Sequence, residues 1–203
     1  YRIILLFLLI TGPGIHLQAQ VSGCTDPQSI NFDSLAIVND GSCQYPPTSI
    51  TPLKIVKSLP LTVRETSGLV FWNNGLWTHN DSGGEPALYK LDTLTGKVLQ
   101  TITLQNAVNI DWEEITQDET RIYIGDFGNN MGSRADLKIY SVSKTDIPSD
   151  VDGEVKSSVI SFSYGDQLDF IPANRNNNYD CEAMIAFGDS LYLFSKNWAD
   201  QKS

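Results

Sequence analysis

A short pattern occurs three times in this chain and constrains the fold more than any other feature of it. An acidic residue is followed two positions later by a polar or acidic residue, then by an apolar residue after two more positions. A turn follows the apolar residue, and an aromatic residue lies eight positions after that apolar residue. The copies run from Glu65 to Trp77, from Asp111 to Tyr123 and from Asp180 to Tyr192. A repeat of this length predicts a repetitive architecture.

The intervals between the copies indicate a β-propeller. Trp77 and Tyr123 are 46 positions apart, close to one propeller blade of about 40–50 residues, and the next interval fits a blade with an insertion. Further segments are rich in strand-forming residues and are separated by turn residues. These segments are 87–91, 97–104, 137–142 and 155–162. We therefore expect an all-β fold of four-stranded antiparallel blades.

The number of strands is too small for a closed ring. The sequence predicts two complete blades and two strands of a third, whereas propellers usually contain about 4–8 blades. The chain begins with Tyr1 instead of Met. We expect it to be a fragment of a longer protein, with an open arc of blades over residues 53–203. The segment Leu53–Leu59 is expected to be the outer strand of the closing blade.

The first 19 residues resemble an export signal. Arg2 is followed by eight apolar residues, then by Gly12-Pro13-Gly14 and a small-residue cleavage site after Ala19. The apolar run is shorter than the roughly 20 residues that span a bilayer. The net charge of −10 argues against nucleic acid and anionic membrane surfaces as partners. We expect a secreted or cell-surface protein without a membrane span after signal removal.

The cysteines predict one disulfide. Cys24 and Cys43 lie in a small module, residues 20–45, and in an exported protein they are expected to pair. Cys181 remains and is expected to be a small buried residue. Residues 46–52 contain three prolines and are expected to be a stiff linker.

The cysteine module is rich in residues that either bind calcium or form turns. Calcium takes six or more oxygen ligands, and the candidates are Asp26, Asn31, Asp33 and Asp40. Asp and Asn also make turns around a disulfide. The sequence leaves both interpretations open.

The predicted propeller channel gathers acidic residues from several blades. The first strand of each blade lines the channel, so Glu113 and Glu182 are expected to converge there as ligands of a cation such as Ca²⁺ or as catalytic groups. A structural role is equally open for both. For Asp111 and Asp180, two positions earlier, a structural role is favoured.

Loops after the second strands supply further candidates. His79 and Asp126 lie in loops that are rich in Asn, Asp and Gly and are expected to rim the same face as the acids. The same composition also forms tight turns. No nucleophile elbow, phosphate loop or zinc spacing is present in the sequence.

These motifs resemble a family of secreted bacterial proteins. The matching segments are Leu76–Gly84, Asp111–Ile115, Ile122–Asn130, Asp180–Met184 and Leu191–Lys196. They are similar to propeller-like proteins of the Bacteroidetes type that have no assigned function. Such proteins are also found beside C-terminal sorting domains of type IX secretion. The chain departs from the family pattern at Cys181 and Asn129.

Two more distant resemblances concern calcium. The module Gly23–Cys43 is similar to thrombospondin type-3 repeats, which bind calcium. The layout of the blades is similar to gluconolactonase-like and phytase-like propellers, which bind Ca²⁺ in the central funnel. This second likeness is an analogy between folds.

Two functions follow as hypotheses. The first is a binding or scaffold module for an extracellular ligand or surface partner, because no complete catalytic constellation is present. The second is a Ca²⁺-dependent hydrolase of esters, lactones or phosphate esters. In that hypothesis Glu113, Glu182 and Asp126 are ligands or bases, and His79 carries protons.

Overall fold

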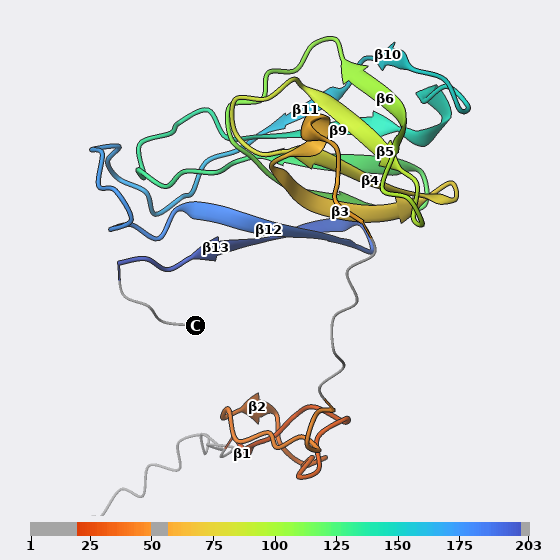
Figure 1. The fold of residues 1–203 in the computed structure, drawn as a ribbon. Coiled ribbons are helices and arrows are strands. Elements are labelled where there is room, and N and C mark those ends of the chain that lie inside the picture. Colours follow the sequence, from red (N-terminus) through yellow and green to blue (C-terminus); the bar gives the residue numbers. More distant parts are fainter. Residues whose placement is uncertain (1–19, 50–56, 200–203) are drawn as a thin grey trace, which may run out of the picture. The chain divides into compact units, whose positions relative to one another are not determined.

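The computed structural model describes residues 20–49 and 57–199. The chain divides into two compact units, residues 1–53 and 54–203, which we describe separately. Within the described ranges the fold is all-β: it consists of strands and two short 3-10 segments, without an α-helix (Figure 1). The expected signal, residues 1–19, lies outside these ranges, and so do residues 50–52 of the linker and residues 53–56 of Leu53–Leu59. Residues 57–59 are described and form no strand.

The small unit is held together by a disulfide. Cys24 and Cys43 are bonded, as predicted, with their Cα atoms 4.8 Å apart. Two short strands, β1 (Ser22–Gly23) and β2 (Val38–Asn39), pair in parallel. The remainder of the described unit is turns, bends and irregular chain, with an isolated bridge between Cys24 and Phe32. A covalent bond therefore replaces the apolar core that so short a segment cannot build.

The first sheet of the large unit is an antiparallel meander. Asn73 and Asn74 both have positive φ (47° and 56°), which is the backbone of a tight hairpin turn. The 3-10 segment η1 (Leu61–Val63) precedes the sheet. The four strands of the meander are β3 (Thr66–Trp72), β4 (Gly75–Asn80), β5 (Ala87–Leu91) and β6 (Val98–Leu104).

The second sheet repeats this meander, with one difference from the sequence prediction. The expected strand over residues 155–162 is wrong as a single element, because the segment changes sheets. β10 (Gly153–Val155) pairs in parallel with β6 of the first sheet, and β11 (Ser158–Ser161) pairs with β9 of the second. The other strands are β7 (Trp112–Gln117), β8 (Arg121–Asp126) and β9 (Lys138–Ser143), followed by the 3-10 segment η2 (Lys144–Asp146).

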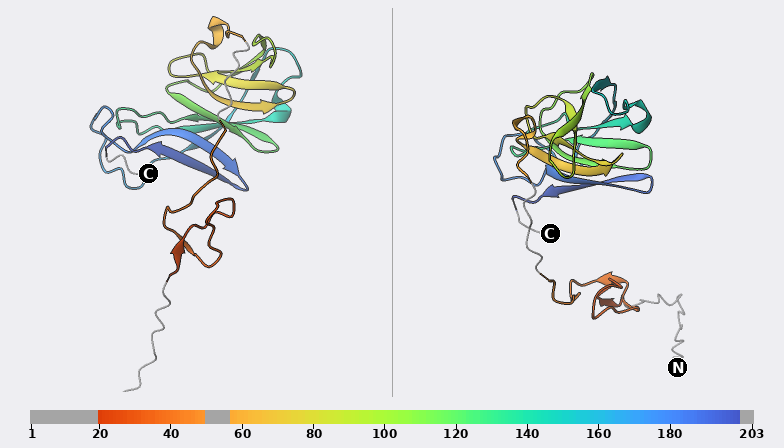
Figure 2. Two further views of the ribbon diagram at one scale, coloured as in Figure 1. Left: turned by 60° about the horizontal axis from the view of Figure 1, so that its bottom comes forward. Right: turned by 45° about the vertical axis from the view of Figure 1, so that its right-hand side comes forward.

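A third sheet consists of one hairpin, β12 (Asp180–Phe187) and β13 (Ser190–Lys196), joined at Gly188, whose φ is +57°. The first strands of the three sheets are neighbours: β7 contacts β3 on one side and β12 on the other (Figures 1 and 2). All three first strands show a register irregularity near their start. The three sheets therefore follow one another in chain order, with their first strands side by side.

Apolar side chains fill the space between consecutive sheets. A cluster around Trp77, Leu88, Trp112 and Ile124 joins the first sheet to the second. A smaller cluster around Phe127, Ile139, Cys181 and Met184 joins the second sheet to the hairpin. Cys181 is free and buried, as its sequence context predicts.

Candidate metal centre

Two acidic residues lie at the start of β7. Trp112 is fully buried, and its indole Nε1 donates a hydrogen bond to the Val108 carbonyl at 3.1 Å. The pairing of β7 with β8 shifts register between Trp112 and Glu114, and at this irregularity Asp111 and Glu113, on either side of Trp112, stay half-buried with their carboxylates close together. Ser67 of β3 holds this segment, because its Oγ donates to the Glu113 carbonyl at 2.6 Å.

These acids meet others from the neighbouring sheets. Carboxylate oxygens of Asp81, Asp111 and Glu113 lie within 4.8 Å of one another, and so do those of Glu113, Asp180 and Glu182. Glu113 belongs to both groups. Asp81 follows β4, and Asp180 and Glu182 begin β12, so three sheets contribute. Both groups could hold a metal ion.

Gly128 closes one side of the cluster. Its amide donates to the Asp111 carbonyl at 3.1 Å. A Cβ at this position would collide with carboxylate oxygens of both Asp111 and Glu113. The absence of a side chain at Gly128 therefore allows the backbone to approach the two carboxylates closely.

Burial and mutual repulsion raise the pKa values of the cluster. Burial raises the pKa of Glu113 to about 8, helped by the charges of Glu182 and Asp81. Burial, followed by the charge of Asp81, raises the pKa of Asp111 to about 6, against the opposing effect of Arg134. Like charges in a partly desolvated site favour uptake of a proton or a cation.

Two members of the cluster also have protein partners. The carboxylate of Asp180 accepts hydrogen bonds from the Asn129 amide and from the Trp198 indole, both at 2.7 Å. Glu182 forms an ion pair with Lys196. Burial raises the pKa of Glu182, and the lysine opposes that shift. Asp180 thus has the structural role that the sequence favoured, and it is also a member of the cluster.

The predicted ligand Asp126 lies outside both groups. It is fully buried, and its Oδ1 is 3.0 Å from Arg134 Nη2 and accepts the Asp111 amide at 3.1 Å. Arg134 also donates to the Gly128 carbonyl at 3.0 Å. Asp126 therefore has its own cation within the protein and anchors the loop behind the cluster.

His79 lies in the core. Its side chain is fully buried, with the ring edge-on to Trp112 and the ring centroids 5.6 Å apart. Nδ1 is 3.0 Å from the Asn80 carbonyl oxygen, and burial lowers the pKa of the imidazole. This position gives no support to the predicted role as a proton carrier.

The predicted calcium ligands of the small unit serve its turns. Side-chain oxygens of Asp26, Asp33 and Asp40 accept the backbone amides two positions ahead, at 2.9 Å in each case. Asn31 Oδ1 accepts the Gln44 amide at 2.7 Å. Among the residues that the structure describes, none of these three aspartates belongs to an acidic group of the kind found at β7.

Asp81 is the acid that sequence reasoning did not select. It lies two positions after His79 in a Gly-rich loop. Its position one residue after β4 was a usable signal, because the ends of second strands were expected on the same face as the acids. Asn109 fixes this loop, since its Nδ2 donates to the Asp81 carbonyl at 2.7 Å.

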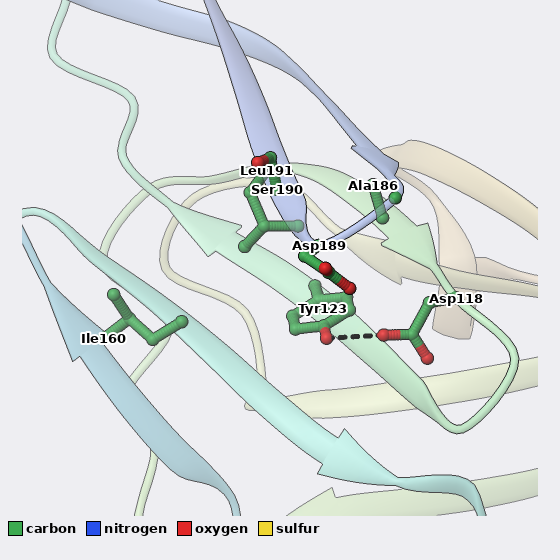
Figure 3. Close-up of a pocket in the computed structure, with 8 residues that line it drawn as sticks. Asp118, Tyr123, Ile160, Ala186, Asp189, Ser190 and Leu191 are labelled. Atoms are coloured by element: carbon green, nitrogen blue, oxygen red, sulfur yellow. Dashed lines mark hydrogen bonds between the residues drawn. The ribbon is translucent and has the colours of Figure 1, made fainter.

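A separate pocket lies at the other end of β7. Its volume is about 320 Å³, and it opens between the β7–β8 turn and the β12–β13 turn (Figure 3). Tyr123 donates a hydrogen bond to Asp118 there at 2.6 Å, which lowers the pKa of Asp118 to about 2. Ile160 and Leu191 line the other walls. This pocket is not part of the acidic cluster.

Comparison with known proteins assigns no relatives: no family model matches the chain, and no curated protein matches it. In the described part of the chain, no helix has the length and apolar character needed to cross a membrane.

Proposed function

We propose that this chain is an exported binding module whose three sheets are consecutive blades of a β-propeller, with Ca²⁺ held by the acids at the start of β7 and β12. The disulfide supports export, because disulfides persist in oxidising compartments. The order of the sheets, with their first strands side by side, supports the propeller. The resemblance to secreted Bacteroidetes-type proteins supports both, and an extracellular or surface ligand is the expected partner.

The position of Glu113 carries the cation proposal. Its carboxylate is shared by two acidic groups that come from three sheets. Burial and the neighbouring acids raise the pKa of Glu113 to about 8, which favours binding of a proton or a cation at neutral pH. Oxygen-rich sites of several carboxylates suit Ca²⁺, which takes 6–8 oxygen ligands. A cation there would be bound by acids from all three sheets.

Calorimetry with Ca²⁺ tests this proposal directly. We expect the purified protein to bind Ca²⁺ with a rise in thermal midpoint, because a ligand of the folded state stabilises it. Glu113→Gln should weaken binding at least tenfold. Glu119→Gln is the matched control, because Glu119 lies on the exposed β7–β8 turn at the far end of the strand, and it should bind normally. Equal binding by both variants, or no binding by the wild type, would refute the proposal.

A Ca²⁺-dependent hydrolase is the second candidate. The observation that favours it is the same raised pKa, because a carboxyl group that titrates near neutral pH suits general acid–base catalysis. Ester, lactone and phosphate-ester substrates should then be cleaved by the wild type. Glu113→Gln and Glu182→Gln should abolish turnover. If the wild type binds calcium but cleaves none of these substrates, the hydrolase hypothesis is rejected and the binding-module proposal stands.

A further inference from the structure

The acidic cluster already holds a positive charge that belongs to the protein. Lys196 ends β13 and is paired with Asp180 in the register of the hairpin β12–β13. Its ammonium forms an ion pair with Glu182, and the Glu182 carboxylate lies in the same acidic group as those of Asp180 and Glu113. The cluster therefore accepts a cation in the structure itself, on the side formed by the hairpin.

The ring of Trp198 also contacts this ammonium. Lys196 Nζ is 5.0 Å from the centroid of the Trp198 ring, which is a cation–π contact. The Trp198 indole in turn donates a hydrogen bond to Asp180 at 2.7 Å. The ring thus connects Lys196 to the cluster, and its surroundings depend on where the ammonium lies.

One lysine is too little charge for this cluster. The two acidic groups have three members each and share Glu113, so they contain five carboxyl groups. In the part of the chain that the structure describes, no lysine or arginine forms an ion pair with Asp81, Asp111 or Glu113. Lys196 therefore balances one of the five acids, and the others still favour a cation.

A divalent ion that binds the cluster meets Lys196 at Glu182. Both cations need the same carboxylate, and like charges a few Å apart repel each other strongly in a half-buried site. The Lys196 side chain is 47 % exposed, and its long flexible stem lets the ammonium move into water. We propose that Lys196 is a built-in competitor of the metal: it neutralises Glu182 in the metal-free protein and leaves this carboxylate when a divalent cation binds. The inference rests on the cation site proposed above.

This competition makes the cluster selective for the charge of the ion. A sodium or potassium ion that replaces the ammonium leaves the net charge of the cluster unchanged, so it gains little electrostatic energy. A divalent ion in the same place adds one positive charge to a site with an excess of acids. Lys196 is therefore a specificity-determining residue and not a ligand.

Calorimetry of lysine variants with Ca²⁺ at constant ionic strength tests the competition. Lys196→Met should lower the dissociation constant about tenfold, because the competing charge is gone. Lys196→Arg keeps the charge and should bind no more tightly than the wild type. Lys97→Met removes the same charge from an exposed position next to the β5–β6 turn and should bind as the wild type does. Exchange of choline chloride for sodium chloride should weaken Ca²⁺ binding more in Lys196→Met than in the wild type.

Tryptophan fluorescence follows the ammonium itself. Ca²⁺ should change the emission of the wild type, because a charge moves away from the Trp198 ring. The part of this change that is lost in Trp198→Phe should also be lost in Lys196→Met. Circular dichroism checks that the variants fold.

The results separate this inference from the cation proposal. If the wild type binds Ca²⁺ and Lys196→Met binds it no more tightly, the competition is overturned and the cation site stands. Equal tightening in Lys97→Met would also overturn the competition, because it would show an effect of net charge alone. If neither the wild type nor Lys196→Met binds Ca²⁺, the cation proposal fails, and the competition fails with it.

Discussion

The two units hold their acidic residues in opposite ways. In the small unit Asp26 and Asp40 accept nearby hydrogen bonds, and those bonds lower the pKa values of both carboxyl groups. In the large unit Asp111 and Glu113 are partly buried beside other carboxylates, and their pKa values rise. The same residue types therefore stabilise turns in one unit and favour binding of a proton or a cation in the other.

The difference comes from the groups that face each carboxylate: Asp26 accepts hydrogen bonds from Tyr45 and Gln28 and Asp40 from Ser42, whereas Asp111 and Glu113 face other carboxylates. An aspartate that binds an amide two positions ahead completes a local turn and stays in water. The acids around Glu113 are brought together by three sheets, where burial removes the water that would screen them. Acidic composition alone does not distinguish these situations.

The largest expected effect concerns Asp126, a fully buried acid of the large unit that is paired with Arg134. Arg134→Met leaves Asp126 buried and unpaired, and we expect a loss of about 3–5 kcal/mol in the free energy of unfolding. Tryptophan fluorescence in urea measures it, because all four tryptophans lie between Trp72 and Trp198. Arg64→Met is the control, since the Arg64 side chain is 72 % exposed. Adding Asp126→Asn to Arg134→Met should recover part of the loss, and equal midpoints for Arg134→Met and Arg64→Met would contradict the ion-pair account.

The disulfide gives the next effect. Replacing Cys24 and Cys43 by serine should destabilise the small unit by about 3 kcal/mol, because the open chain gains conformational entropy. Loss of amide dispersion around Gly23 in NMR spectra measures this change. The tryptophan unfolding midpoint should stay in place, and a shift in it would show that the two units depend on each other.

The pH dependence of the cluster gives a smaller effect. The pKa of Glu113 is about 8 in the folded protein, above its ordinary value of 4.5, so the folded state holds the proton more tightly than the unfolded state does. Stability is then highest at low pH and falls as pH rises towards 8 and beyond. Without calcium, we expect the wild type to lose on the order of 2 kcal/mol between pH 5 and 9 relative to Glu113→Gln, a value reduced for solvent screening. Parallel pH profiles of the two proteins would contradict this, and Glu119→Gln should follow the wild type.

The smallest effect is expected in the turns of the small unit. Asp40 has a lowered pKa, so the stability that its charge contributes is present at neutral pH and is lost as pH falls through the acidic range. Asp40→Asn keeps an acceptor for the Ser42 amide and should remove only this acid dependence. NMR titration of the Ser42 amide measures it. A drop in calcium affinity in this variant would instead favour a calcium site in the small unit.

Much of the strand pattern could be predicted because it depends on local chemistry. Alternating apolar residues at 87–91 and turn residues at Asn73-Asn74 specify strands and hairpins within a few positions, and the pairing of Cys24 with Cys43 follows from their context. Asp126 was expected as a candidate ligand, and in the structure it lies outside the acidic groups and pairs with Arg134. Its partner Arg134 comes from a loop whose path no local pattern predicts. Asp81 reaches the cluster through the packing of β4 beside β7, which is a contact between sheets that no local pattern predicts either.

The segment 148–161 has a consequence for how the molecule comes apart. β10 is hydrogen-bonded to β6 of the first sheet, while β11, a few residues later, is hydrogen-bonded to β9 of the second. Gln100 also donates to the Pro148 and Val151 carbonyls at 2.7 and 2.6 Å. Because this segment is hydrogen-bonded to both sheets, opening one sheet at this edge strains the hydrogen bonds of the other. The two sheets should therefore unfold together as one foldon. Their core amides should then exchange with solvent at a common rate, while the hairpin β12–β13 is free to open first.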